Sequence, residues 1–187
     1  MNGFDREIQR PAHLFLRLPV AAQSGANAES IIHAHNQIFE SEGRVFFCKF
    51  GLPPDKSHIK KLNEQITGGV TTHIFFSLRT GKGVRGYSAN LKSVSTDPPL
   101  PEHSRLIPKY YQALQPFEHP GQLWLMLESQ IGDFDLRALR LRSNKRALLD
   151  VISETRTPAM IVELTPTVAA ATPPVSRGVR RNSPPMG

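Results

Sequence analysis

Two β-prone segments joined by a glycine turn constrain the fold of this chain more than any other feature. Residues 71–78 are rich in β-branched and aromatic side chains, and residues 84–94 form a second segment of this kind. The four residues 80–83 (TGKG), between these two segments, are typical of a tight hairpin turn. Strands joined directly by a turn argue against a doubly wound parallel sheet, because helices connect the strands in that fold.

The rest of the chain alternates further β-prone and helical segments. Apolar residues at helical spacing, with polar cap residues before them, predict three helices over residues 28–42, 55–67 and 143–152. Strands are expected at residues 13–18, 44–50, 123–128 and 159–164. Residues 135–141 are expected to form a strand or a short turn, and residues 95–108 a proline-containing loop. The pattern predicts an α+β fold, with a mixed, curved sheet or a small open β-barrel and about three helices.

The length of 187 residues suits one hydrophobic core. Residues 1–10 are polar, which indicates a flexible N-terminal lead-in, and residues 11–164 are expected to form a single domain. From residue 165 to residue 187 the chain has five prolines, three arginines and no acidic residue. This composition predicts a disordered, basic, proline-rich tail.

Charge and cysteine content limit the partners and the compartment. The net charge is +7, and 20 basic against 16 acidic residues remain when the tail is set aside, which is compatible with a polyanionic partner. Cys48 is the single cysteine, so no internal disulfide can form, and a reducing cytoplasm fits the chain. No stretch reaches the roughly 18 apolar residues of a membrane helix, and the N-terminus lacks the order of a signal peptide. We therefore expect a cytoplasmic protein with no membrane partner.

The sequence carries no recognisable catalytic, metal-binding or cofactor-binding motif. His33 and His35 are two residues apart on an expected helix, where a shared metal needs a spacing of three or four. Cys48 lies among aromatic residues, which favours a packing role over that of a nucleophile. The glycines at 81 and 83 precede a strand rather than a helix, so they do not form a phosphate loop. An enzyme in an unfamiliar fold stays the least favoured reading.

Binding features are better represented. Arg79, Lys82 and Arg85 flank the hairpin turn, which places three cations at one sheet edge, and a second basic cluster with Arg140, Arg142 and Lys145 lies within residues 137–146. Such clusters can contact phosphates, although a solvated surface explains them equally well.

Two adjacent tyrosines, Tyr110 and Tyr111, follow Pro108. On a strand or loop their side chains point in opposite directions, so at most one packs inward easily. The other is either a platform on which a base can stack or an exposed tyrosine with no role.

The order of several short motifs resembles the EVE-type domain of the PUA-like superfamily, which is related to YTH and ASCH domains. The matching segments, all between residues 13 and 164, are the IFFS sequence at 74–77, VRGY at 84–87, IPKYY at 107–111, LWL at 123–125 and LRSN at 141–144. Phe15 stands where that family usually has a tryptophan in its first strand.

This resemblance implies a reader of nucleic acid, DNA or RNA, that takes a flipped and modified (methylated) base into an aromatic pocket and works with an effector protein. The candidate nucleic-acid-binding residues are Ser77, Arg79, Lys82, Arg85, Tyr87, Tyr110, Tyr111 and Trp124. Trp124 lies between two leucines, which favours the core, and Tyr87 is open to the same reading. An aromatic cavity is expected beside Arg79 and Arg85. The alternative is a non-catalytic protein-interaction domain whose basic tail docks an acidic partner.

Overall fold

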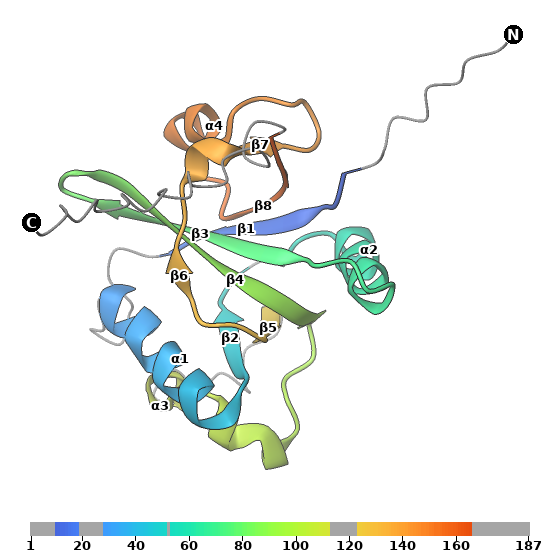
Figure 1. Cartoon of the computed structure of the whole chain (residues 1–187), viewed down its shortest axis with the longest axis vertical. Coiled ribbons are helices and arrows are strands. Elements are labelled where there is room, and N and C mark those ends of the chain that lie inside the picture. Colours follow the sequence, from blue (N-terminus) through green and yellow to red (C-terminus); the bar gives the residue numbers. More distant parts are fainter. Residues whose placement is uncertain (1–9, 19–27, 52, 113–122, 166–187) are drawn as a thin grey trace, which may run out of the picture.

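A computed structural model describes residues 10–18, 28–51, 53–112 and 123–165. These residues form eight strands, four α-helices and two short 3₁₀ helices (Figure 1). The strands are β1 (His13–Arg17), β2 (Val45–Lys49), β3 (His73–Thr80), β4 (Gly83–Ser95), β5 (Leu123–Leu127), β6 (Gly132–Asp133), β7 (Leu139–Leu141) and β8 (Ala159–Leu164). The helices are α1 (Ala28–Glu42), α2 (Lys56–Thr67), α3 (Lys109–Gln112), α4 (Leu148–Glu154), η1 (Pro101–Leu106) and η2 (Leu136–Ala138).

The strands form one mixed, open sheet in the order β2-β5-β4-β3-β1-β8-β7, with β6 paired to β4. β1 is parallel to β3, and the other pairs are antiparallel, including the β3–β4 hairpin that the glycine turn predicts. The long strand β4 pairs with β3 in its first part and with β5 after a register shift between Leu91 and Ser93. An irregularity of this kind bends a sheet. The α+β class and the mixed sheet are thus confirmed.

The alternation of side chains along the strands gives each face of the sheet its own core. Leu14, Leu16 and Ile74 pack with α1 and α2, whereas Phe15 and Phe75 pack with α4 and η2. Figure 1 shows α4 above and α1 below the long β3–β4 pair. We call these the α4 face and the α1 face of the sheet.

Local capping signals set the long helices where the sequence predicts them. The α1 helix ends at Gly43, whose φ of +68° favours glycine and whose N–H donates to the Phe39 carbonyl at 2.8 Å. The α2 helix begins after Asp55, whose carboxylate accepts from the Ser57 N–H at 2.7 Å.

The short elements differ from the expectations. Residues 95–108 include the helix η1, and Tyr110 and Tyr111 lie on the helix α3 rather than on a strand or loop. Residues 135–141 contain both a turn, η2, and a strand, β7. The α4 helix begins at Leu148, because the Asn144 side chain accepts from the Arg146 N–H and so caps the preceding turn instead.

None of the helices in the described ranges is long and apolar enough to cross a membrane. The expected lead-in and tail fall almost entirely on residues 1–9 and 166–187, which lie outside the described residues.

Candidate binding site

Three of the four aromatic rings expected to line a pocket belong to the hydrophobic core. Tyr87, Tyr111 and Trp124 are 5%, 3% and 1% exposed. Trp124 lies opposite Cys48 in the β2–β5 pair and packs against Phe46. Burying a large ring stabilises the fold by removing apolar area from water. The core position favoured for Trp124 is therefore confirmed, and so is the core alternative for Tyr87. The expectation of an open cavity walled by these rings beside Arg79 and Arg85 is wrong.

The Tyr111 hydroxyl has a structural task. It accepts a hydrogen bond from the Cys48 N–H at 3.0 Å and donates one to the Cys48 carbonyl at 2.9 Å. These backbone groups face away from β5, at the edge of the sheet, so Tyr111 satisfies a residue of an edge strand. Cys48 is 3% exposed and packs in the core, which confirms the expected packing role, and burial raises the pKa of its thiol to about 12.

The three cations of the hairpin are not one cluster. In the register of β3 and β4, Arg79 lies opposite Val84 and Arg85 lies opposite Leu78, so the two arginines are on opposite faces. Arg85, on the α1 face, contacts Glu29 of α1 at 2.9 Å and Asp133 of β6 at 3.2 Å, and its guanidinium lies 5.2 Å from the centre of the Tyr87 ring. The expectation of a single cationic edge is wrong, because alternate strand residues point to alternate faces.

Arg79 and Lys82 remain exposed and have no ion pair within the described part of the chain. Ser77, expected beside them in the site, is 5% exposed. Its position opposite Gly86 places it on the α4 face, where it is buried at the base of the hairpin.

The second basic cluster is held in place by hydrogen bonds and is only partly balanced in charge. Arg140 and Lys145 both donate to the Glu163 carboxylate, at 2.6 and 2.8 Å, and Arg142 donates to the Arg10 carbonyl at 3.2 Å. Burial alone would raise the pKa of Glu163, but the hydrogen bonds from Lys145 and Arg140 outweigh it and hold that pKa below its ordinary value. These contacts hold the β7–β8 edge together, but in the described residues Glu163 balances only one of the three positive charges.

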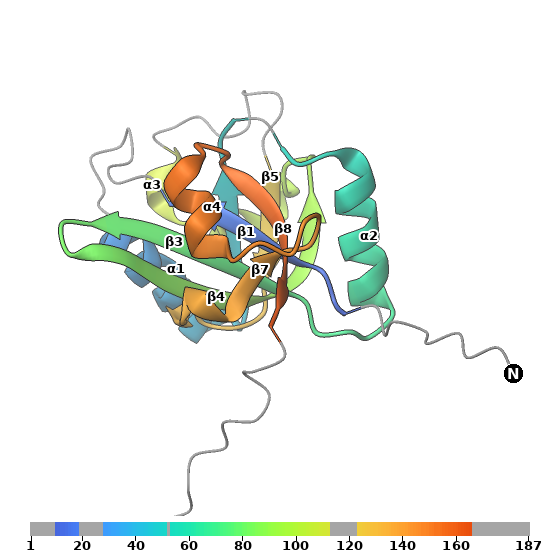
Figure 2. The ribbon, with the colours of Figure 1, turned by 90° about the horizontal axis from the view of Figure 1, so that it is seen from above.

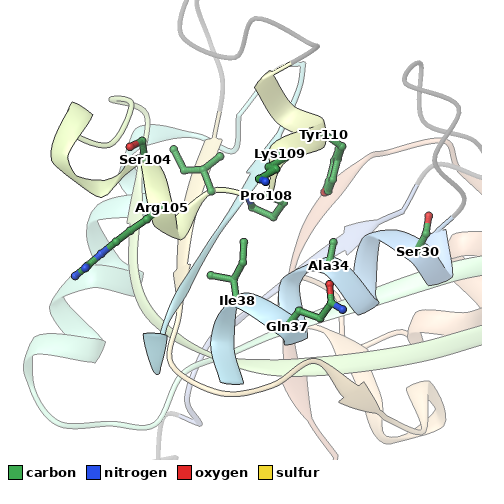
Figure 3. Close-up of a pocket in the computed structure, with 10 residues that line it drawn as sticks. Ser30, Ala34, Gln37, Ile38, Ser104, Arg105, Pro108, Lys109 and Tyr110 are labelled. Carbon is green, nitrogen blue, oxygen red and sulfur yellow. The ribbon is translucent and has the colours of Figure 1, made fainter. Parts of the chain in front are cut away.

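A pocket of about 710 Å³ opens elsewhere on the α1 face, between α1 and the η1–α3 segment (Figure 3). Its size falls in the usual range of small-ligand sites. The residues that line it are Ser30, Ala34, Gln37, Ile38, Ser104, Arg105, Ile107, Pro108, Lys109 and Tyr110. One of the eight candidate residues, Tyr110, is among them.

The pocket combines an apolar wall with polar groups at its mouth. Ala34 and Ile38 of α1 face Pro108 across the opening, and Gln37 lies beside them (Figure 3). Arg105 extends away from the other lining residues and contacts Glu42 at 3.3 Å. Lys109 is exposed and has no ion pair among the described residues, so its charge is available to an anion.

Beneath the pocket, Tyr110 closes an aromatic cluster around His35. The His35 ring stacks on Phe47 at 5.0 Å, and its Nδ1–H donates to the Ile31 carbonyl at 2.7 Å. Complete burial lowers the pKa of His35 to about 4, so the ring is neutral at pH 7.

The Tyr110 hydroxyl is buried without a hydrogen-bond partner in the described residues. The Tyr111 hydroxyl is close enough to affect the pKa of Tyr110. The Tyr111 hydroxyl is already hydrogen-bonded to Cys48, however, and it does not form a hydrogen bond with Tyr110. The Tyr110 ring is therefore a pocket wall, and its hydroxyl adds little to the stability of the fold.

Four lining residues come from one helix that sequence reasoning assigned to packing alone. Ser30, Ala34, Gln37 and Ile38 are spaced by four, three and one residues, which is one stripe of an α-helix. A stripe of small and polar residues beside the apolar stripe of this helix was the sequence feature that could have indicated a pocket wall. The opposite wall, residues 104–110, could not be paired with it from local pattern.

No protein-family model matches the chain, and no curated protein or solved structure does so either. Among the described residues, no group of three or more histidine, cysteine, aspartate or glutamate side chains is placed to hold a metal ion.

Proposed function

We propose that this chain is a nucleic-acid-binding module of the PUA-like, EVE-type class that holds one nucleotide in the pocket between α1 and α3. The observation that carries the proposal is an apolar pocket wall beside Lys109, an exposed cation with no ion pair among the described residues. A nucleotide presents the matching chemistry, since its base is flat and largely apolar on its faces and its phosphate is anionic.

The buried rings change where a base can lie. Tyr87, Tyr111 and Trp124 cannot stack on a ligand without leaving the core, so the pocket offers a base the flat ring of Tyr110 and the apolar ring of Pro108. Gln37 supplies an amide that both donates and accepts hydrogen bonds and can therefore read a base edge. A methyl group on the base would add roughly 0.8 kcal/mol if it is buried against Ala34 and Ile38.

The charge of the whole chain supports the same partner class. A net charge of +7 attracts polyanions and raises the rate of encounter with them. The single, buried Cys48 suits a reducing compartment such as the cytoplasm.

The proposal is tested by filling the pocket. Fluorescence polarisation of the full chain with labelled single-stranded DNA, duplex DNA and RNA, each with and without a methylated base, gives the affinities. The Ala34→Trp variant should bind at least about tenfold more weakly, because the indole occupies the space of the nucleotide. The control is His33→Trp, an exposed position of the same helix that does not line the pocket. Equal affinities for the two variants would refute the pocket as the site.

A charge variant tests the role of the mouth. Lys109→Ala should reduce the slope of log affinity against log salt by about 0.7 on a single strand, the change for one phosphate contact. An unchanged slope would mean that Lys109 contacts no phosphate.

Replacing the three tail arginines in the full chain (R177A/R180A/R181A) separates the body from the tail. Binding that survives this change belongs to the pocket-bearing body, and binding that is lost would remove the support for the pocket as the site.

A further inference from the structure

The tip of the β3–β4 hairpin is a two-stranded ribbon that extends beyond the sheet. β1 pairs with β3 only as far as Ser77, and β6 pairs with β4 only from Tyr87 onward. The three last pairs of the hairpin, within residues 78–85, have no further strand on either edge in the described structure. Figures 1 and 2 show this tip reaching past the helices of the body. We call residues 78–85 the ribbon.

The ribbon is basic and contains no acidic residue. Arg79 and Lys82 are exposed and have no ion pair in the described residues, so their charges are not balanced locally. Arg17 lies near Arg79 on the α4 face, and its guanidinium donates to the carbonyls of Thr155 and Thr157 at 2.5 and 3.1 Å. Burial, and then the nearby charge of Arg79, lower the pKa of Arg17.

The base of the ribbon is held in place. Leu78 is 6% exposed in the core of the α1 face, and Arg85 is tied to both Glu29 and Asp133. Gly83 closes the turn with a φ of +130°, a conformation that favours glycine. A ribbon fixed at its base presents its tip with little loss of freedom on binding.

Resting on the proposed function, we propose that this ribbon enters the major groove of double-stranded DNA. The major groove of B-form DNA, about 12 Å wide, admits a two-stranded β-ribbon, whereas the major groove of duplex RNA is too narrow for side chains to read. Arg79 and Lys82 would contact phosphates or guanine edges, and Val84, which is 42% exposed beside Arg79, provides an apolar contact for a thymine methyl group. The ribbon thus selects duplex DNA, while the pocket takes a single nucleotide.

The test compares duplex DNA with a single strand of the same sequence, using the full chain. The R79A/K82A variant should bind the duplex about tenfold or more weakly, with a salt slope reduced by about 1.8, as expected for two lost phosphate contacts. Its affinity for the single strand should change less than about threefold. The matched control is K56A/K61A, which removes two exposed lysines from α2, on the other side of the molecule from the ribbon (Figures 1 and 2).

The outcomes separate the two proposals. Three results would refute the ribbon as a DNA-binding element without affecting the pocket proposal. The R79A/K82A variant could bind duplex DNA as tightly as wild type, or it could lose the same affinity for duplex and single strand. The K56A/K61A control could also lose as much duplex affinity as R79A/K82A. Wild-type chain that binds single strands but not duplex DNA also overturns the ribbon. Wild-type chain that binds no nucleic acid overturns the proposed function itself. Both variants change only exposed side chains, and an unchanged melting temperature verifies their fold.

Discussion

The ring cluster beneath α3 and the β3–β4 ribbon both look like ligand-contacting regions in the sequence, yet the fold treats them in opposite ways. The rings of Tyr111 and Trp124 are almost completely buried, whereas Arg79 and Lys82 stay in water without a carboxylate partner in the described structure. Burial of a ring stabilises the chain, whereas burial of an unpaired charge costs free energy. Aromatic residues proposed from a sequence as ligand contacts are therefore often buried in the core, whereas cationic residues stay at the surface.

Neighbouring residues show the same contrast at close range. Tyr111 is in the core and hydrogen-bonded, while Tyr110, one position earlier, lines the pocket. Arg85 is balanced by two carboxylates, while Arg79, six positions earlier on the same hairpin, has none in the part of the chain that the structure describes. Single substitutions at these residues should therefore differ widely in their effects.

Removing the Trp124 side chain should have the largest effect. Trp124→Ala leaves a cavity in the core around β5, so we expect the free energy of unfolding to fall by about 3–5 kcal/mol. Urea unfolding followed by circular dichroism measures it. The Arg79→Ala variant is the reference, with an unchanged midpoint. A loss below 1 kcal/mol for Trp124→Ala would place that ring outside the core.

The buried His35 should make the stability depend on pH. Its pKa is lowered by burial from 6.5 to about 4, so the unfolded chain binds a proton more readily than the folded chain does between these values. The His35 contribution is complete above pH 6.5 and falls by roughly 3 kcal/mol as the pH drops from 6.5 to 4.

The measurement is urea unfolding of wild-type and His35→Phe chains at a series of pH values. The variant should lose about 3 kcal/mol less than the wild type over this range. His13, whose pKa is also lowered to about 4 by burial, is present in both chains and cancels in the difference. Identical pH profiles would contradict a neutral, buried His35.

Two conservative variants separate the adjacent tyrosines. Tyr111→Phe leaves the N–H and carbonyl of Cys48 without their partner, so we expect a loss of about 1–3 kcal/mol. Tyr110→Phe removes a hydroxyl with no hydrogen-bond partner in the described residues, and the stability should stay within about 0.5 kcal/mol of wild type. Equal losses in the two variants would mean that both hydroxyls support the fold.

The smallest effects are expected from single arginines of the hairpin. Arg79→Ala should weaken binding to duplex DNA by about three- to fivefold, and Arg85→Ala by less than twofold, because Glu29 and Asp133 already balance the Arg85 charge. Polarisation titrations at one salt concentration give both values. A larger loss of affinity for Arg85→Ala than for Arg79→Ala would mean that Arg85, and not Arg79, is the arginine that contacts DNA.

The elements that the sequence predicts well are those set by local signals. The α1 helix and β8 have the expected bounds, and the turn of the β3–β4 hairpin is where the glycines indicate, because caps, periodicity and turn residues act over a few positions. The same local reasoning places the α2 helix after Asp55.

The position of the pocket could not be predicted from local sequence signals, for two physical reasons. Tyr110 and Tyr111 lie on a single turn of helix, where adjacent side chains diverge by about 100° rather than 180°, so the strand assumption misplaced them. The pocket also requires α1 and residues 104–110 to meet, and a contact of that sequence separation is decided by packing rather than by local pattern.

The most direct test of the account is a map of the residues that sense the ligand. Backbone amide NMR spectra of the full chain, titrated with a short single-stranded oligonucleotide, should show the largest shifts within residues 30–38 and 104–110, which form the two walls of the pocket. Shifts concentrated on α2 or α4, or no shifts at millimolar oligonucleotide, would contradict a nucleotide site between α1 and α3.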